Sequence, residues 1–136
     1  MPRPMLVYLL ALACLQLGVV DARPALAQKK HAFVVGIDKY DNLSPDRQLQ
    51  KAVGDAKAIS DTLTGMGFTV VIAPNVTRPI FNERWQSFLD DIKPGDTAAF
   101  VFSGHGVEIN GANYLLPRDV PRLRLGRDEQ LKRESL

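Results

Sequence analysis

The chain has almost no cysteine and very little histidine. Its 136 residues include one cysteine, Cys14, and two histidines, His31 and His105. Because Cys14 lies in an apolar N-terminal run, the rest of the chain has no thiol, which excludes disulfides and cysteine-based metal sites there. Two histidines without an HExxH pattern are too few ligands for a zinc centre, and no convincing calcium loop is present. The sequence therefore predicts no metal and no cofactor.

An excess of charge of one sign is also lacking. There are 17 basic and 15 acidic residues, giving a formal net charge of +2. The Arg118–Arg133 segment is basic in part, but interspersed acidic residues make it a solvated surface of mixed charge. This balance gives no support to nucleic-acid binding. With 46% apolar and 24% charged residues, the composition is that of an ordinary globular protein of one domain.

The one long apolar run lies at the N-terminus. A basic residue precedes Leu6–Val20, and Ala25-Leu26-Ala27 forms an A-x-A site before the polar Gln28. This order is typical of a secretory signal peptide. About fifteen apolar residues fall short of the roughly 20 that a membrane-spanning helix needs. We expect residues 1–27 to be a signal peptide, residues 28–136 to be the mature domain, and the protein to be exported to the periplasm or secreted, without a membrane span. Lipid attachment at Cys14 is the alternative.

The mature part reads as alternating strands and helices. Apolar runs and helical spacings predict strands at His31–Ile37, Phe68–Ile72 and Thr97–Ser103, and helices at Ala52–Met66 and from Thr77 to Ile92. The order β-α-β-α-β with short connections predicts a parallel sheet covered by helices, an α/β fold. The last strand has no polar alternation, which predicts burial on both faces. The second helix is expected to put Trp85 in the core, and Asn110-Gly111 predicts a β-hairpin between Val107–Ile109 and Ala112–Leu116.

The most informative segment is Ser103-Gly104-His105-Gly106, where the third strand ends. Glycines on both sides of a histidine let the backbone turn sharply and approach a ligand closely. Active sites in parallel sheets lie at the carboxyl ends of the strands, the edge at which Asp38 and Lys39 also fall. A histidine there is suited to general acid–base catalysis beside a nucleophile. Ser103 lacks the G-x-S-x-G elbow of serine hydrolases, so the sequence disfavours it as that nucleophile.

These residues resemble the caspase-like superfamily of cysteine peptidases, in particular its bacterial metacaspase-type branch. The resemblance runs through most of residues 32–119. It rests on five segments in their family order: Gly36–Tyr40, Ala52–Ala56, Gly67-Phe68, Phe102–Gly106 and Asn113–Asp119.

The resemblance implies a three-layer caspase-like fold with a mainly parallel sheet and a Cys–His dyad that cleaves peptide or protein substrates. His105 matches the catalytic histidine, and the backbone N–H of Gly106 matches an oxyanion-hole donor. Asp55 matches an acidic substrate-binding residue for Arg or Lys, although Gly54 stands where the family has Asn. The alternative for Asp55 is a helix N-cap.

The nucleophile of the resembled family is absent. Caspases carry the catalytic Cys about 50 residues after the His, whereas 31 residues follow His105 and none is Cys. We therefore expect a domain truncated after the third strand and its β-hairpin, inactive alone, with an open sheet edge through which the chain self-associates. The alternative is a non-catalytic pseudo-peptidase that binds peptides or a partner protein.

Export predicts a defined N-terminus. The protein purified from an export-competent host should begin at Gln28, because the A-x-A site precedes it. Mass analysis of the N-terminal peptide checks this expectation. A retained Met1, or a lipid on Cys14, would contradict it.

Overall fold

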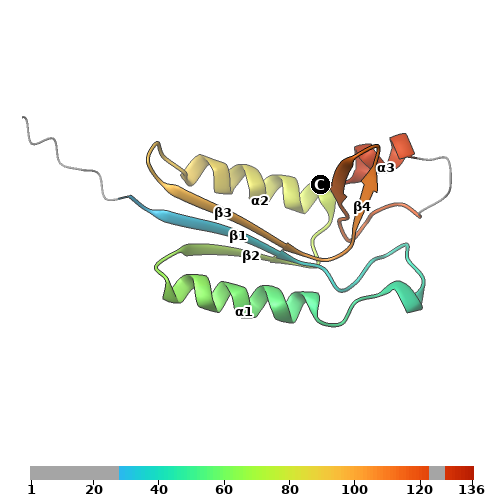
Figure 1. Cartoon of the computed structure of the whole chain (residues 1–136), viewed down its shortest axis with the longest axis horizontal. Helices are drawn as coiled ribbons and strands as arrows, with labels where there is room; N and C mark the ends of the chain where they lie inside the picture. The colour runs from blue at the N-terminus through green and yellow to red at the C-terminus, as the bar shows by residue number, and fades with distance from the viewer. Residues whose placement is uncertain (1–27, 123–127) are drawn as a thin grey trace, which may run out of the picture.

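The computed structural model of the chain describes residues 28–122 and 128–136, so the predicted signal peptide lies outside the described residues. The parallel sheet has the strand order β2-β1-β3, and a separate antiparallel pair is formed by β4 and β5. Helices α1 and α2 cover opposite faces of the sheet, and the hairpin and α3 lie at the end where the parallel strands finish (Figure 1). The predicted α/β class with a parallel sheet is confirmed. The elements are β1 (Lys30–Gly36), η1 (Pro45–Arg47), α1 (Ala52–Gly65), β2 (Thr69–Pro74), α2 (Arg78–Asp91), β3 (Thr97–Ser103), β4 (Gly106–Ile109), β5 (Ala112–Leu115) and α3 (Asp128–Glu134).

Strand β1 is the centre of the core. All its residues from His31 onward are buried, because it has a strand on each side and a helix on each face. Side chains alternate across a strand, so Phe33 and Val35 join one apolar cluster while Ala32 and Val34 join another with Ala56 of α1. On the α2 side the ring of Phe33 meets that of Trp85 edge to face, with centroids 5.4 Å apart. The prediction that Trp85 packs against the core is confirmed.

Helix α1 packs against β1 through small residues. Its buried side chains, Ala52, Ala56 and Ser60, recur every four residues. Two larger apolar side chains of this helix, Ile59 and Met66, are 36% and 58% exposed. The close approach of the two backbones is centred on the small side chains, and the larger ones fall at the margin of that stripe.

The outer strands are less buried than the sequence predicted. Strand β3 was expected to be buried on both faces, yet Phe100 is 42% exposed, and β2 buries only Ala73. Both strands lie at edges of a three-stranded sheet, so each has one strand neighbour among the described residues. A continuous apolar run is compatible with burial of both faces of a strand. At the edge of this sheet β2 and β3 have fewer neighbours, so part of their apolar surface stays exposed.

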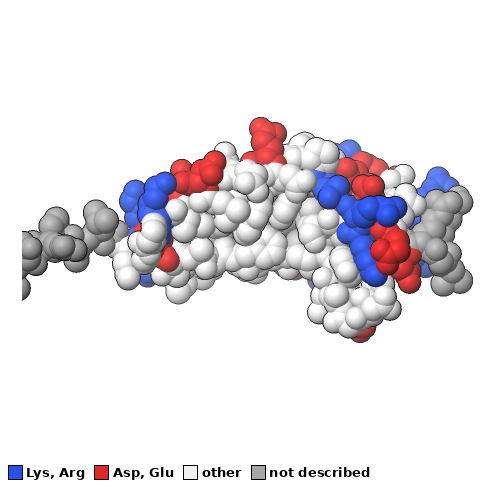
Figure 2. Space-filling view, turned by 90° about the horizontal axis from the view of Figure 1, so that it is seen from above, with Lys and Arg blue, Asp and Glu red and all other residues white. Residues whose placement is uncertain are grey.

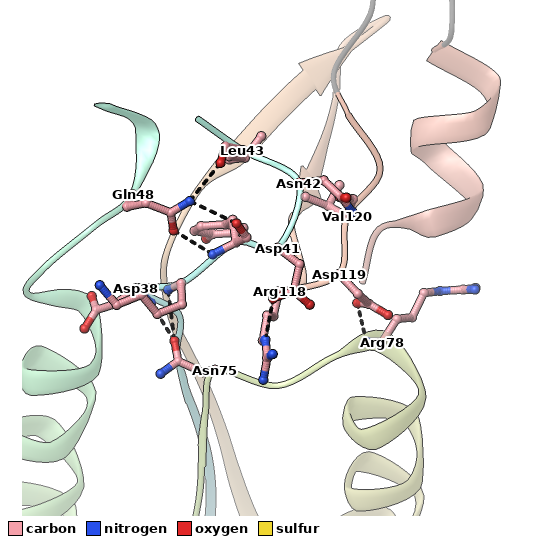
Figure 3. Close-up of polar contacts among 12 residues, drawn as sticks. Asp38, Asp41, Asn42, Leu43, Gln48, Asn75, Arg78, Arg118, Asp119 and Val120 are labelled. Carbon is pink, nitrogen blue, oxygen red and sulfur yellow. Dashed lines mark hydrogen bonds and ion pairs between the residues drawn. The ribbon is translucent and has the colours of Figure 1, made fainter. Parts of the chain in front are cut away.

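The segment after the hairpin joins two other loops, the one that follows β1 and the one that connects β2 to α2. The N–H of Arg118 donates to the carbonyl of Val76, and its own carbonyl accepts from the N–H of Asp41, both at 2.9 Å. The carboxylate of Asp119 accepts a 2.8 Å hydrogen bond from the N–H of Arg78 (Figure 3). Thr77 occupies the N-cap position of α2 without a side-chain hydrogen bond, so Asp119 supplies the acceptor instead.

The predicted hairpin is confirmed. Strands β4 and β5 pair in register from Gly106 with Leu115 to Ile109 with Ala112. The two loop residues, Asn110 and Gly111, have φ of 54° and 80°, which is the pattern that a two-residue type I′ turn requires.

The contact of Gly36 with α1 gives a test of this packing. A Cβ at Gly36 would lie 2.6 Å from the Ala52 carbonyl oxygen and 2.7 Å from the Ala56 Cβ. Gly36→Ala should therefore lower the free energy of unfolding by about 1–3 kcal/mol, the usual cost of overpacking. Gly54→Ala is the matched control: its Cβ would meet nothing within 4 Å, and it should stabilise α1 by about 0.8–1 kcal/mol. Urea unfolding of both variants measures the difference, and equal effects would refute the close packing.

Candidate active site

The loop that leaves β1 is fixed by polar contacts on both sides. The Oδ1 of Asn75 accepts hydrogen bonds from the N–H groups of Asp38 and Lys39, at 2.9 and 3.0 Å (Figure 3). In turn Asp38 Oδ1 accepts a 2.8 Å hydrogen bond from the N–H of Ala52, the first residue of α1. Asp38 therefore caps α1. The alternative that Asp55 caps this helix is wrong, because Lys51 is the N-cap and Asp55 lies inside the first turn.

The next part of this loop is closed by Gln48. Its Oε1 accepts from the N–H of Tyr40 at 2.8 Å, and its Nε2 donates to the carbonyls of Tyr40 at 2.9 Å and Leu43 at 3.0 Å (Figure 3). The short helical turn η1 lies between Leu43 and Gln48. These contacts bring Tyr40 and Arg47, which are seven positions apart, to the same histidine.

His105 is held at its backbone and at its ring. Its N–H donates to the hydroxyl of Tyr40 at 2.7 Å, and its Nε2 lies 2.7 Å from the carbonyl oxygen of Arg47. A carbonyl oxygen can only accept, so Nε2 carries the proton of this hydrogen bond. In the neutral ring the other nitrogen, Nδ1, is then unprotonated and able to act as a base.

Tyr40 supports His105 as a neutral phenol. The side chain is buried, with 2% of the residue exposed. Burial raises the pKa of Tyr40 above its ordinary value, the hydrogen bond from the N–H of His105 opposes this change, and the nearby charge of Asp38 adds to it. The phenol therefore stays protonated at neutral pH, and its ring lies against the His105 ring with centroids 4.9 Å apart.

Gly106 follows directly, at the start of β4. The N–H of Leu116 donates to the carbonyl of His105, at 3.0 Å, and Gly106 is in register with Leu115. In an antiparallel ladder this arrangement makes Gly106 and Leu115 a pair without mutual hydrogen bonds. The N–H of Gly106 therefore points away from β5, and the residue is exposed.

Asp55 lies near the His105 loop, which comprises the residues from Ser103 to His105. A groove of about 420 Å³ is lined by Asp55 together with Ser103 and Gly104, the two residues that precede His105. Lys51 lines the same groove and is exposed, so a carboxylate and an ammonium group share its wall. The structure thus brings Asp55 close to the His105 loop. Lys39 is exposed to solvent, and the carboxylate of Asp38 accepts a hydrogen bond from the first residue of α1.

Sequence reasoning missed Gln48 and Arg47. Tyr40 belongs to a segment that carries the resemblance, but nothing in the sequence indicated that its hydroxyl meets His105. Gln48 is a single amide within a polar loop, and Arg47 contributes a backbone carbonyl that any residue type has. No pattern of side chains could have identified either residue.

In the part of the chain that the structure describes, no group of three or more His, Cys, Asp or Glu side chains is arranged to hold a metal ion. Within the same residues, no helix has the length and apolar character needed to cross a bilayer.

Comparison with known families places the chain. The family model described as the caspase domain matches residues 29–133. No curated protein sequence matches the chain.

The hydroxyl of Tyr40 provides a test of how His105 is held. Tyr40→Phe leaves the part-buried N–H of His105 without its acceptor, so the free energy of unfolding at pH 7 should fall by about 1–3 kcal/mol. Because the pKa of Tyr40 is raised on folding, its proton is released more readily by the unfolded chain, and stability is lost as the pH rises above about 10, the ordinary tyrosine value.

The Tyr40→Phe protein should not show the part of the fall in unfolding free energy at alkaline pH that the Tyr40 hydroxyl causes. Urea unfolding at several pH values measures both effects, with Tyr114→Phe as the matched control, since it removes the same atom from β5. An unchanged free energy for Tyr40→Phe would show that the hydroxyl does not hold His105.

Proposed function

The chain belongs to the caspase domain family, and on this premise we propose that it carries the histidine half of a cysteine-peptidase site of the metacaspase type. Family membership suggests cysteine-peptidase-type function and implies protein substrates. The observation that carries the proposal is the 2.7 Å contact of His105 Nε2 with the Arg47 carbonyl. That contact leaves Nδ1 as the ring nitrogen that can take a proton from a thiol.

The reaction assigns a step to each group. His105 Nδ1 accepts the thiol proton, and the thiolate attacks the carbonyl carbon of a peptide bond. Negative charge develops on the carbonyl oxygen, where the N–H of Gly106 is the proposed donor. One such donor is typically worth about 2.7–4 kcal/mol of transition-state stabilisation. The imidazolium then returns the proton to the leaving amine as the C–N bond breaks, and an acyl-enzyme remains for water to hydrolyse.

Asp55 is the proposed substrate-binding residue. Its exposed carboxylate in the groove next to the His105 loop is suited to a basic side chain of the substrate, Arg or Lys. The Lys51 ammonium in the same wall opposes this attraction. We expect Asp55→Asn to weaken the binding of basic peptides and Lys51→Gln to strengthen it.

The thiol has to come from outside residues 28–136, which contain no cysteine. Strand β3 offers a place for it, because β3 pairs with β1 on one side and has no strand on its other side among the described residues. Figure 2 shows that Lys and Arg gather towards the two ends of the molecule on the α2 side. Between them the surface is uncharged apart from Asp and Glu along one edge of the view. An apolar, unpaired strand edge favours pairing with another strand.

A second candidate function is peptide binding without hydrolysis. The observation that favours it is the same lack of cysteine, since a groove can bind a peptide without a nucleophile. In that case the chain would bind basic peptides without any added fragment, and His105 would have no catalytic role.

Activity measurements distinguish the two functions. The chain alone should not cleave peptides after Arg, Lys or Asp, and His105→Ala should change nothing, because the base has no thiol to activate. Addition of a separate fragment with the later strands of a caspase domain, including its Asp-Ala-Cys segment, should produce cleavage that His105→Ala abolishes. Cleavage by the chain alone that depends on His105 would refute the account of the thiol. A fragment that binds β3 without producing cleavage would favour the binding function.

The ladder of β3 provides a design for testing self-association through its edge. The N–H of Thr97 donates to Lys29 and the carbonyl of Ser103 accepts from Ile37, so alternate residues from 97 to 103 face β1 and Ala98 faces outward. Ala98→Pro removes an outward N–H and should shift the chain from oligomer to monomer without unfolding it.

Ala99→Pro is the matched control, since it removes an N–H that faces β1 and should destabilise the fold. Size-exclusion chromatography and urea unfolding measure both variants. Self-association that is unchanged in a folded Ala98→Pro protein would exclude this edge as the contact.

A further inference from the structure

We propose that Gln48 is a positioning residue that holds His105 in its catalytic orientation from outside the apolar core. This inference rests on the proposed function only for the word catalytic, because the contacts of Gln48 are a property of the fold. Its half-buried side-chain amide makes three hydrogen bonds, of 2.8, 2.9 and 3.0 Å, and all three go to the backbone of Tyr40 and Leu43. These use the Oε1 acceptor and both Nε2 protons of one amide.

The first route from Gln48 to His105 passes through Tyr40. The amide of Gln48 engages both the N–H and the carbonyl of Tyr40, so it fixes the position of that residue's backbone. The Tyr40 hydroxyl then accepts the N–H of His105 at 2.7 Å. A displacement of the Tyr40 backbone would therefore displace the acceptor of the His105 backbone.

The second route passes through the peptide group that joins Arg47 to Gln48. Its carbonyl accepts from Nε2 of His105, and its N–H, which belongs to Gln48, donates to the carbonyl of Pro45 at 3.3 Å. The orientation of this one peptide plane determines whether Nε2 has an acceptor. Residues 44–47 are all exposed, so the peptide plane itself lies outside the apolar core. Leu43 and Leu49, which flank this turn, pack against the core, and the Gln48 side chain closes the turn between them.

Both contacts of His105 thus come from a loop that is closed by one side chain that does not touch the histidine. The Tyr40 ring is also held by the apolar core. The amide of Gln48 closes the loop from Tyr40 to Gln48, and this loop carries both the Tyr40 hydroxyl and the Arg47 carbonyl. Loss of the amide should release the ring and the backbone of His105 at the same time. It should leave β1 in place, because that strand is held by its own ladder and by both apolar clusters.

Amide hydrogen exchange in the full chain tests this inference. In Gln48→Leu the exchange of the His105 N–H should accelerate by about tenfold or more, which corresponds to losing roughly 1.4 kcal/mol of local stability. The N–H groups of Phe33 and Val34 in β1 should keep their protection. Gln48→Glu retains the acceptor for Tyr40 but cannot donate to the two carbonyls when ionised, so its effect should be intermediate.

Gln50→Leu is the matched control. Gln50 is an exposed glutamine two positions along the chain, and its replacement should leave the exchange of His105 unchanged. The proposal is overturned if Gln48→Leu and Gln48→Glu leave the exchange of His105 as it was, or if the N–H groups of β1 lose protection in parallel with it. The second result would make Gln48 a residue of general stability. No peptidase activity is measured, so a failure here is distinct from a failure of the proposed function.

Discussion

The close packing of α1 against the carboxyl end of β1 determines where the following loop can run. Gly36 has no side chain, and the backbone of α1 occupies the space that a Cβ would need. This places the N–H of Ala52 within reach of Asp38, so the loop from Asp38 to Lys51 begins and ends at one point. Within that closed loop Tyr40 is directed into the core and η1 toward solvent. His105, arriving from β3, therefore meets a hydroxyl and a carbonyl whose positions are already set.

The two histidines have different partners at opposite ends of the sheet. His31, at the start of β1, is buried with its Nε2 3.4 Å from Oδ2 of Asp96. The N–H groups of Lys29 and Lys93 and the nearby His31 lower the pKa of that Asp96 carboxyl. His105 instead contacts a phenol and a peptide carbonyl, both uncharged. A carboxylate partner is suited to a structural role for His31, whereas the carbonyl contact leaves one nitrogen of His105 available for proton transfer.

Much of the fold follows from the sequence, because the spacing of apolar residues indicates which face of a helix or strand packs against the core. Apolar spacing located β3 and α1. The Asn110-Gly111 pair located the hairpin, whose turn has the required positive φ angles. Apolar spacing could not distinguish the central strand β1 from the edge strands β2 and β3, since all of them are apolar runs. Burial depends on how many neighbours a strand has, which the run itself does not specify.

The candidate site was predictable only in part for a related reason. His105 and Gly106 stand out locally, since glycines flank a histidine at a strand end. The contacts that orient the histidine join positions 40, 47, 48 and 105, and they involve backbone groups that every residue has. The cap of α1 shows the same limit, because the sequence pointed to Asp55 as a cap and only the path of the loop brings Asp38 to the N–H of Ala52.

The central claim is that Arg47 fixes the proton of His105 on Nε2 and leaves Nδ1 free. It is tested most directly by nitrogen-15 NMR of the histidine rings in the full chain at about pH 8, where an ordinary histidine is neutral. The account predicts one tautomer for His105, with Nδ1 unprotonated and an Nε2 proton that exchanges slowly enough with water to give its own signal. A proton on Nδ1, or an averaged ring whose Nε2 proton exchanges freely, would contradict it.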